Sequence, residues 1–219
     1  MRGRYNISDS DHVWSSDWTI GHGNKIYILL IKIYILLIID LSTRFVVASE
    51  VLERQPKGGD IVNLLMIGIR DINVVPKIFH TDCGGAYMSR ELASFLKEKK
   101  IEHSHREGEE SHFYNQVIER LNKKIWNELE SLNWINSKSG IKRFIKASKE
   151  DAKFLIKSVI EKINLDKPGN WTEGNPQELY ARLSEQPRKY GIMASKDTQE
   201  GKWVKHYQEY VIIQTRIRL

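Results

Sequence analysis

Apolar runs of strand length dominate the first half of the chain. These runs are rich in isoleucine, valine, tyrosine and phenylalanine, which favour strands, and residues typical of turns separate them. The turn sites Gly21–Asn24 and Ser42–Thr43 are short, so the first three strands are predicted to form an antiparallel meander. The predicted strands are Val13–Ile20, Ile26–Leu41, Phe45–Leu52, Lys77–Thr81 and Ile101–His105.

Apolar residues at helical spacing lie between the later strands and through the second half of the chain. Ser89 is placed to cap a helix that carries Leu92, Phe95 and Leu96, and Pro168 ends the last helical stretch. The predicted helices are Ile61–Arg70, the helix after Ser89, a long amphipathic helix that includes Val117–Leu129, and Ile141–Ile163. The order βββαβαβ followed by helices predicts an α/β domain with a helical C-terminal extension.

One heptapeptide, KIYILLI, occurs twice in tandem, as Lys25–Ile31 and Lys32–Ile38. Strand side chains alternate between the two faces of a sheet. An insertion of odd length therefore moves all residues on one side of it to the opposite face, unless a bulge or a loop absorbs the change. The repeat predicts either an extended hairpin or a disrupted strand.

Composition favours a globular protein that meets a polyanion. The chain has 219 residues, of which 41% are hydrophobic, and this is enough to bury a core. Its formal net charge of +6 is typical of proteins that bind nucleic acid or an acidic membrane surface. Cys83 is the single cysteine, which excludes an internal disulfide and any zinc site that needs several thiolates.

Nothing at the N-terminus resembles a secretory signal, because Met1–Asp11 is polar and charged. The longest apolar run, Ile26–Ile39, is interrupted by Lys32 and is shorter than the roughly 20 residues of a membrane-spanning helix. Its isoleucine and tyrosine content favours a buried strand. We therefore expect a cytoplasmic protein that is associated with DNA or the nucleoid and has no membrane partner.

Three acidic residues lie in segments that suggest chemistry. Asp82 follows a predicted strand and precedes a glycine turn in the segment HTDCGGAY, His80–Tyr87. Active-site groups of α/β sheets lie at such strand ends. Glu119 lies near the start of the long helix, in the segment NQVIER, and Asp17 lies on the first predicted strand.

Together these segments resemble the catalytic core of retroviral integrases and of the insertion-sequence transposases that carry a DDE triad. His80–Tyr87 is similar to the family's second-aspartate motif, and Asn115 with Glu119 matches its terminal Asn-x-x-x-Glu helix motif. Ile39–Arg44 looks like the family's second-strand signature, which lies downstream of the first catalytic aspartate. That position assigns the first aspartate to Asp17.

The resemblance covers roughly Val13–Leu132 and implies an α/β, ribonuclease-H-like fold. This fold is a mixed five-stranded sheet with flanking helices, here followed by a C-terminal helical and basic extension. Three parts are expected: a polar leader at 1–12, the integrase catalytic core at 13–135, and the extension at 136–219. The leader is too short for the helix-turn-helix or zinc module that such proteins usually carry upstream.

For function, the resemblance implies metal-dependent DNA strand cleavage and strand transfer during DNA integration. Asp17, Asp82 and Glu119 are the implied catalytic and metal-binding residues. Carboxylates that lie close together repel one another and retain protons unless a cation neutralises them, and oxygen ligands suit Mg²⁺ or Mn²⁺. Two such ions would activate the attacking oxygen and stabilise the leaving oxygen. The implied partners are DNA, as transposon ends and target, and further copies of this chain.

The sequence leaves alternatives open. Asp40 competes with Asp17 as the first aspartate if the repeat shifts the strands. A repeat that misplaces Asp17 would leave a truncated or inactivated transposase remnant that only binds DNA or multimerises. A simple metal-dependent nuclease on the same fold would cleave without joining. Lys123 and Lys124 either contact DNA phosphates or are solvated surface residues, and the same two readings apply to the basic tail Arg182–Leu219.

Overall fold

The computed structural model describes residues 13–26, 29–105, 112–133, 135–138, 141–144, 149–166 and 175–184, with the backbone alone at 22–26, 29–31, 112–116, 135–138, 141–144, 149 and 182–184. The strands are β1 (Val13–Ile26), β2 (Leu29–Asp40), β3 (Val46–Leu52), β4 (Ile78–Thr81), β5 (Glu102–His105), β6 (Ile135–Lys138) and β7 (Ile141–Phe144). The helices are α1 (Gly58–Ile72), α2 (Arg90–Glu98), α3 (His112–Ser131), α4 (Lys149–Leu165) and α5 (Pro176–Ser184).

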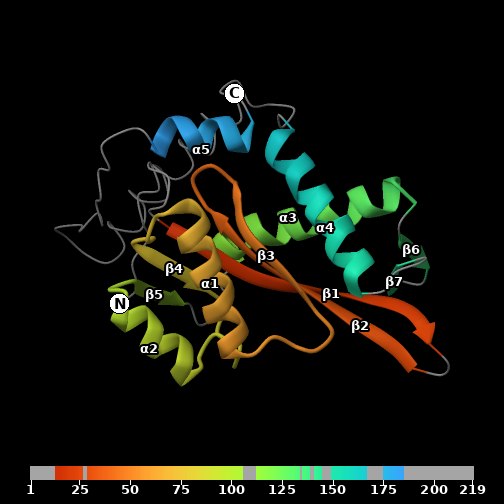
Figure 1. Cartoon of the computed structure of the whole chain (residues 1–219), viewed down its shortest axis with the longest axis horizontal. Helices are drawn as coiled ribbons and strands as arrows, with labels where there is room; N and C mark the ends of the chain where they lie inside the picture. Colours follow the sequence, from red (N-terminus) through yellow and green to blue (C-terminus); the bar gives the residue numbers. More distant parts are fainter. Residues whose placement is uncertain are drawn as a thin grey trace.

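Five strands form a mixed sheet in the order β3-β2-β1-β4-β5 (Figure 1). The first three strands form the predicted antiparallel meander, and β4 and β5 run parallel to β1. β6 and β7 form a short hairpin, and β7 adds to β1 through the pair His22↔Arg143. The fold is therefore the predicted ribonuclease-H-like sheet with two additional strands.

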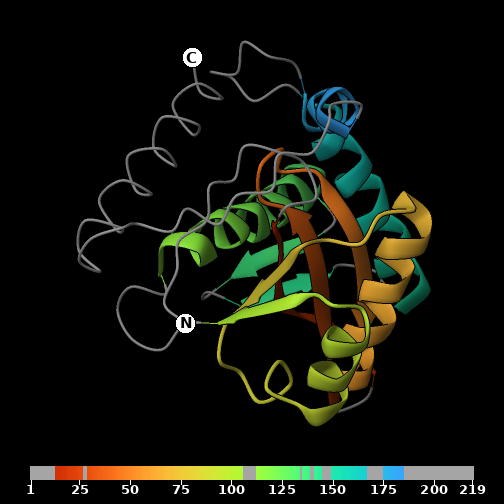
Figure 2. The same ribbon diagram turned by 90° about the vertical axis from the view of Figure 1, so that its left-hand side faces the viewer.

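Each face of the sheet has its own core and its own helices, because strand side chains alternate between faces. On one face, Ile35 and Leu37 of β2 pack with α3 and α4. On the other face, Leu36 and Ile38 pack with α1 and α2. Figure 2 shows α3 and α1 on opposite sides of the strands. Burial on both faces explains why the heptapeptide is almost continuously apolar instead of alternating.

The longest apolar run of the sequence lies in the β1–β2 hairpin, as predicted, and not in a helix. No helix in the described part of the chain is long and apolar enough to cross a membrane.

The helix predicted over Ile141–Ile163 is wrong at its start. The first four of these residues form β7, and the helix begins only at Lys149. Helix α5 was not predicted; it docks by stacking Tyr180 on Phe45, with ring centroids 4.7 Å apart. The polar leader and nearly all of the basic tail Arg182–Leu219 lie outside the described residues.

The tandem repeat lengthens the β1–β2 hairpin and does not disrupt it. Pairing continues from Trp14↔Asp40 to Ile26↔Leu29, and the hairpin tip projects beyond the rest of the sheet (Figure 1). The turn predicted at Gly21–Asn24 is therefore wrong, because these residues lie inside β1. The second copy of the heptapeptide supplies the buried centre of β2, and the first copy supplies the projecting end.

A bulge absorbs the odd length of the insertion. The register shifts between His22 and Lys25, where Gly23 and Asn24 face a single residue of β2, Ile31. Without the repeat, His22 and Lys25 would flank Gly23 and Asn24 as a two-residue hairpin turn, for which glycine and asparagine are suited. The residues of that turn now form the bulge, so the side chains closer to the sheet centre keep their faces.

Deletion of Lys32–Ile38 is predicted to leave the fold intact, because the first copy then supplies the same side chains at the same core positions. We expect an unfolding free energy within about 1 kcal/mol of that of the parent chain, measured by urea denaturation. Deletion of Ile33–Ile38 is the matched control. It puts Lys32 in the fully buried position of Ile38 and should cost on the order of 3 kcal/mol or more. Equal destabilisation by both deletions would contradict the hairpin register.

Candidate active site

Two of the three predicted carboxylates lie where β1 and β4 meet. The last residues that pair between these parallel strands are Ser15 and His80. Asp17 and Asp82 each lie two residues further along the chain. Strand side chains repeat with a period of two, and Ile78, two residues before His80, belongs to the core under α3 and α4. Both carboxylates therefore belong to the face of the sheet that α3 covers.

Helix α3 lies along β1 and brings a polar group to Asp17. Asn122 Nδ2 donates a hydrogen bond to Asp17 Oδ2 at 3.0 Å. About one turn later, Trp126 Nε1 donates to Thr19 Oγ1, also at 3.0 Å. Gly21 permits this approach, because a Cβ atom at that position would collide with the Trp126 ring. Asp17, Thr19 and Gly21 are alternate residues of β1 on the face that α3 covers, and their contacts fix the register of α3 on the sheet.

The three predicted carboxylates share one electrostatic site. The pKa of Asp17 is raised from 3.8 to about 6, chiefly because its side chain is buried. The charges of Asp82 and Glu119 raise it further, while hydrogen bonds from the Trp18 backbone and from Asn122 lower it. Glu119 itself is exposed, three residues before Asn122 on α3. Burial and nearby negative charges both disfavour the ionised form of a carboxyl group and so raise its pKa.

Asp82 is held by its own turn and by the neighbouring strand. Gly84 N donates to Asp82 Oδ1 at 2.8 Å. Thr81 Oγ1 donates to the Asp82 carbonyl at 2.9 Å and lies 2.9 Å from His103 Nε2. Because the only hydroxyl proton of Thr81 is used in the first bond, His103 must donate from Nε2. Burial and the charge of His105 lower the pKa of His103 to about 4, so this imidazole is neutral near pH 7.

Asp40, the competing first aspartate, has a structural role. It is fully buried, and its Oδ2 accepts hydrogen bonds from Ser42 Oγ at 2.7 Å, Thr43 N at 2.9 Å and Thr43 Oγ1 at 2.7 Å. These contacts close the turn between β2 and β3. The geometry therefore favours Asp17 as the first aspartate of the site.

The remaining predicted residues lie on α3. The side chain of Asn115 lies outside the described residues. Lys123 is exposed and Lys124 is half-buried, and Arg120 next to Glu119 is also exposed. The surface of α3 beside Glu119 is therefore positively charged, which suits an approaching phosphate backbone as well as solvent.

Sequence reasoning missed two residues that contact the aspartate segments, Asn122 and His103. The position of Asn122, three residues after Glu119 on one helix, was the available signal, because residues at that spacing share a face. His103 offered no comparable signal, since its role depends on the pairing of β4 with β5.

The donor set suits a hard divalent cation. All three carboxylates offer oxygen, and the Asn122 Oδ1 atom is buried with no hydrogen-bond partner among the described residues. The raised pKa of Asp17 means that its ionised form is unfavourable in the absence of a nearby positive charge. Among the residues that the structure describes, no group of three or more His, Cys, Asp or Glu side chains is arranged so that it could hold a metal ion. The carboxylates therefore influence one another electrostatically without forming a closed set of metal ligands.

Residues 8–108 match the family model of the integrase core domain. The match includes Asp17 and Asp82 and ends before α3, so Glu119 lies outside it. No curated protein matches the chain.

Solved retroviral integrase structures are similar to this one. The HTLV-2 integrase catalytic core domain in complex with magnesium, in a trimeric form, gives a TM-score of 0.57 at 17% identity and covers 78% of this chain and 96% of that chain. Its dimeric form gives 0.56 at 17% identity, with 78% and 97% covered. A chain of the simian T-cell lymphotropic virus intasome in complex with PP2A regulatory subunit B56 gamma gives 0.60 at 18% identity, with 90% of this chain and 63% of that chain covered.

This chain therefore spans less than two thirds of the intasome chain but nearly the whole of the isolated catalytic cores. At these identities the likeness concerns the fold, and the sequence match of residues 8–108 concerns the family. Residues 8–108 thus match the integrase core domain, and the chain has the ribonuclease-H-like fold of an integrase catalytic core.

Proposed function

We propose that this chain is the catalytic part of a DNA transposase or integrase, which cleaves DNA strands and joins them to a target with the help of divalent metal ions. One observation carries the proposal. Asp17, Asp82 and Glu119 come from three separate segments, yet they interact in one site where the pKa of Asp17 rises to about 6. Such a site favours cations. The HTLV-2 core that this chain resembles is in complex with magnesium, which supports Mg²⁺ or Mn²⁺ as the cation.

In this proposal Asp17 and Asp82 would together hold one ion, and Glu119 would complete a second site. When bound, such a pair of ions activates an attacking oxygen, first of water and then of a 3′-hydroxyl, and stabilises the leaving oxygen in an in-line displacement. Asp17 gives up its proton when the cation binds. The amide of Asn122 keeps that carboxylate oriented, and the N–H of Gly84 does the same for Asp82.

The surface around the site supports DNA, as element ends and target, as the substrate. Glu119 is exposed, so a large substrate can reach it, and Arg120 and Lys123 beside it are exposed cations. Contacts between such residues and phosphates are independent of base sequence and position the backbone. A chain that joins two DNA ends to a target would act as a homo-oligomer on DNA.

The two alternative functions differ from the proposal in testable ways. The tandem repeat was the main reason to consider an inactivated remnant. The bulge at Gly23 and Asn24, however, leaves Asp17 on the face that α3 covers. A metal-dependent nuclease would use the same carboxylates and would cleave DNA without joining it.

Glu119→Gln is predicted to abolish both strand cleavage and strand transfer and to leave DNA binding intact, because it removes a charge and keeps the shape of the side chain. Both rates should fall on the order of 10³-fold or more with Mn²⁺, measured on a fluorescent duplex with 3′-hydroxyl ends and a supercoiled plasmid target. Glu130→Gln, an exposed glutamate on the same helix, is the matched control and should leave both rates unchanged. Cleavage without joining by the parent chain would identify a nuclease, and full activity of Glu119→Gln would remove Glu119 from the site.

Asp17→Asn is predicted to stabilise the metal-free fold at neutral pH. The folded-state pKa of about 6 lies above the ordinary 3.8, so between these values the folded chain keeps a proton that the unfolded chain has lost. Stability therefore falls as the pH rises from about 4 to about 6. The full cost, on the order of 3 kcal/mol at most, is present above pH 6. Urea denaturation should find Asp17→Asn more stable than the parent at about pH 7.5 and nearly equal at about pH 3.5.

Asp71→Asn, which changes an exposed aspartate of α1, is the control and should alter stability little at either pH. Mn²⁺ binding by the parent chain should weaken below about pH 6, because a ligand carboxylate must be ionised. A stability difference between Asp17→Asn and the parent that is the same at both pH values would contradict the raised pKa.

A further inference from the structure

Backbone pairing between β1 and β4 stops before it reaches the aspartates. The last paired residues are Ser15 and His80, and Asp17 and Asp82 lie two residues beyond them. Carboxylates that repel one another need a support that fixes their separation. Beyond the last ladder pair, that support has to come from side chains.

A turn connects the Asp82 carboxylate to a buried tyrosine. Gly84 N donates to Asp82 Oδ1 at 2.8 Å, and the Gly84 carbonyl accepts from Tyr87 N at 2.9 Å and from Met88 N at 3.0 Å. Only 1% of Tyr87 is exposed, and its side chain lies in the core under α1 and α2, on the opposite face from the carboxylates. The turn thus connects Asp82, on one face of the sheet, to the buried side chain of Tyr87 on the other face.

The hydroxyl of Tyr87 reaches β1 next to Asp17. It lies 3.1 Å from Ser16 Oγ, and Ser16 Oγ donates to the carbonyl of Leu37 at 2.9 Å. Since Ser16 has a single hydroxyl proton, the Tyr87 hydroxyl must be the donor to Ser16. Burial holds the pKa of Tyr87 well above its usual range, so this donor keeps its proton. Ser16 precedes Asp17, and Leu37 is the cross-strand partner of Asp17.

We propose that Tyr87 is a positioning residue whose hydroxyl ties the Asp82 turn to β1 behind Asp17 and so fixes the separation of the two carboxylates. The chain of hydrogen bonds from Asp82 through Gly84, Tyr87 and Ser16 replaces the backbone ladder where that ladder ends. This role rests on the proposed metal-dependent function, because the separation of the carboxylates matters for a shared ion.

The test compares Tyr87→Phe, which removes only the hydroxyl, with Ser16→Ala, which removes its acceptor. Tyr34→Phe is the matched control, since Tyr34, on β2, is also a buried tyrosine but has no place in this chain of hydrogen bonds. Mn²⁺ affinity is measured by calorimetry, and amide hydrogen exchange of residues 82–88 by mass spectrometry, both well below the unfolding temperature.

We expect each of Tyr87→Phe and Ser16→Ala to weaken Mn²⁺ binding on the order of ten-fold and to accelerate exchange in residues 82–88 by a similar factor. The double variant should resemble either single variant, because both break the same tie. Tyr34→Phe should change neither measurement.

Unchanged Mn²⁺ affinity in Tyr87→Phe, with lowered stability alone, would make Tyr87 an ordinary core residue and overturn the proposal. If the parent chain binds no Mn²⁺, the proposed metal-dependent function fails, and the exchange measurement still decides whether the tie exists. Unchanged amide exchange of residues 82–88 in both Tyr87→Phe and Ser16→Ala would overturn the positioning role of Tyr87. If Tyr87→Phe does not fold, Ser16→Ala decides by the same two measurements.

Discussion

The partly buried carboxylate of Asp17, set between β1 and α3, is the constraint on which the rest of the structure depends. A carboxylate can lie between a sheet and a helix only if it is oriented by hydrogen bonds and is either protonated or neutralised. Asn122 supplies the hydrogen bond, whereas Asp82 and Glu119 make ionisation harder. Burial, together with this repulsion, opposes ionisation of Asp17 in the metal-free folded chain, and a cation that binds the folded state would recover that cost.

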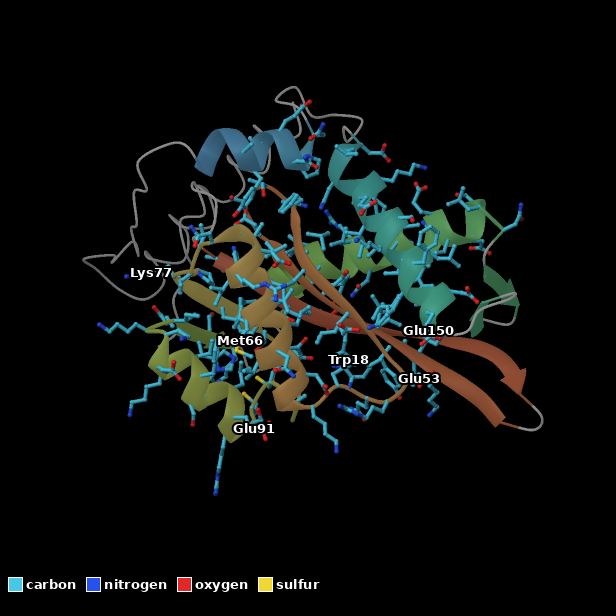
Figure 3. The ribbon with its side chains drawn as sticks, viewed as in Figure 1. Trp18, Glu53, Met66, Lys77, Glu91 and Glu150 are labelled. Atoms are coloured by element: carbon cyan, nitrogen blue, oxygen red, sulfur yellow. The ribbon has the colours of Figure 1, made fainter. Side chains whose placement is uncertain are left out.

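That preference for a cation matters only where the carboxylates cannot move apart, and buried apolar side chains line both faces of the sheet. Figure 3 shows the side chains on the ribbon. Trp18, labelled there, points to the α1 face and packs 5.5 Å from the ring of Tyr34. Its neighbour Asp17 consequently faces α3, where Trp126 fixes the register of the helix. A strand buried on both faces has no freedom to rotate, so the apolar residues of β1 decide where its acidic residue points.

Much of this could be predicted from the sequence, because the carboxylates lie in segments with recognisable chemistry and the strands and helices follow their periods. The short polar contacts could not be. Asn122 reaches Asp17 only because α3 packs tightly on β1, and that packing needs a residue without a side chain at Gly21. His103 contacts Thr81 only because β4 and β5 pair in parallel. Such contacts are set by tertiary register, and neither hydrophobic period nor turn chemistry encodes it.

The misplaced turn has a different cause. Gly23 and Asn24 are residue types that favour a tight turn, and a hairpin with a single copy of the heptapeptide would place its turn at these residues. The second copy offered further strand residues, and pairing them outweighed the turn preference, so the two residues became a bulge. Only a hairpin tip can absorb such an insertion, because there both strands lengthen outward and no paired residue nearer the sheet centre changes its partner. Asp17 lies near the start of β1, far from the hairpin tip, so changes in hairpin length leave its position unchanged.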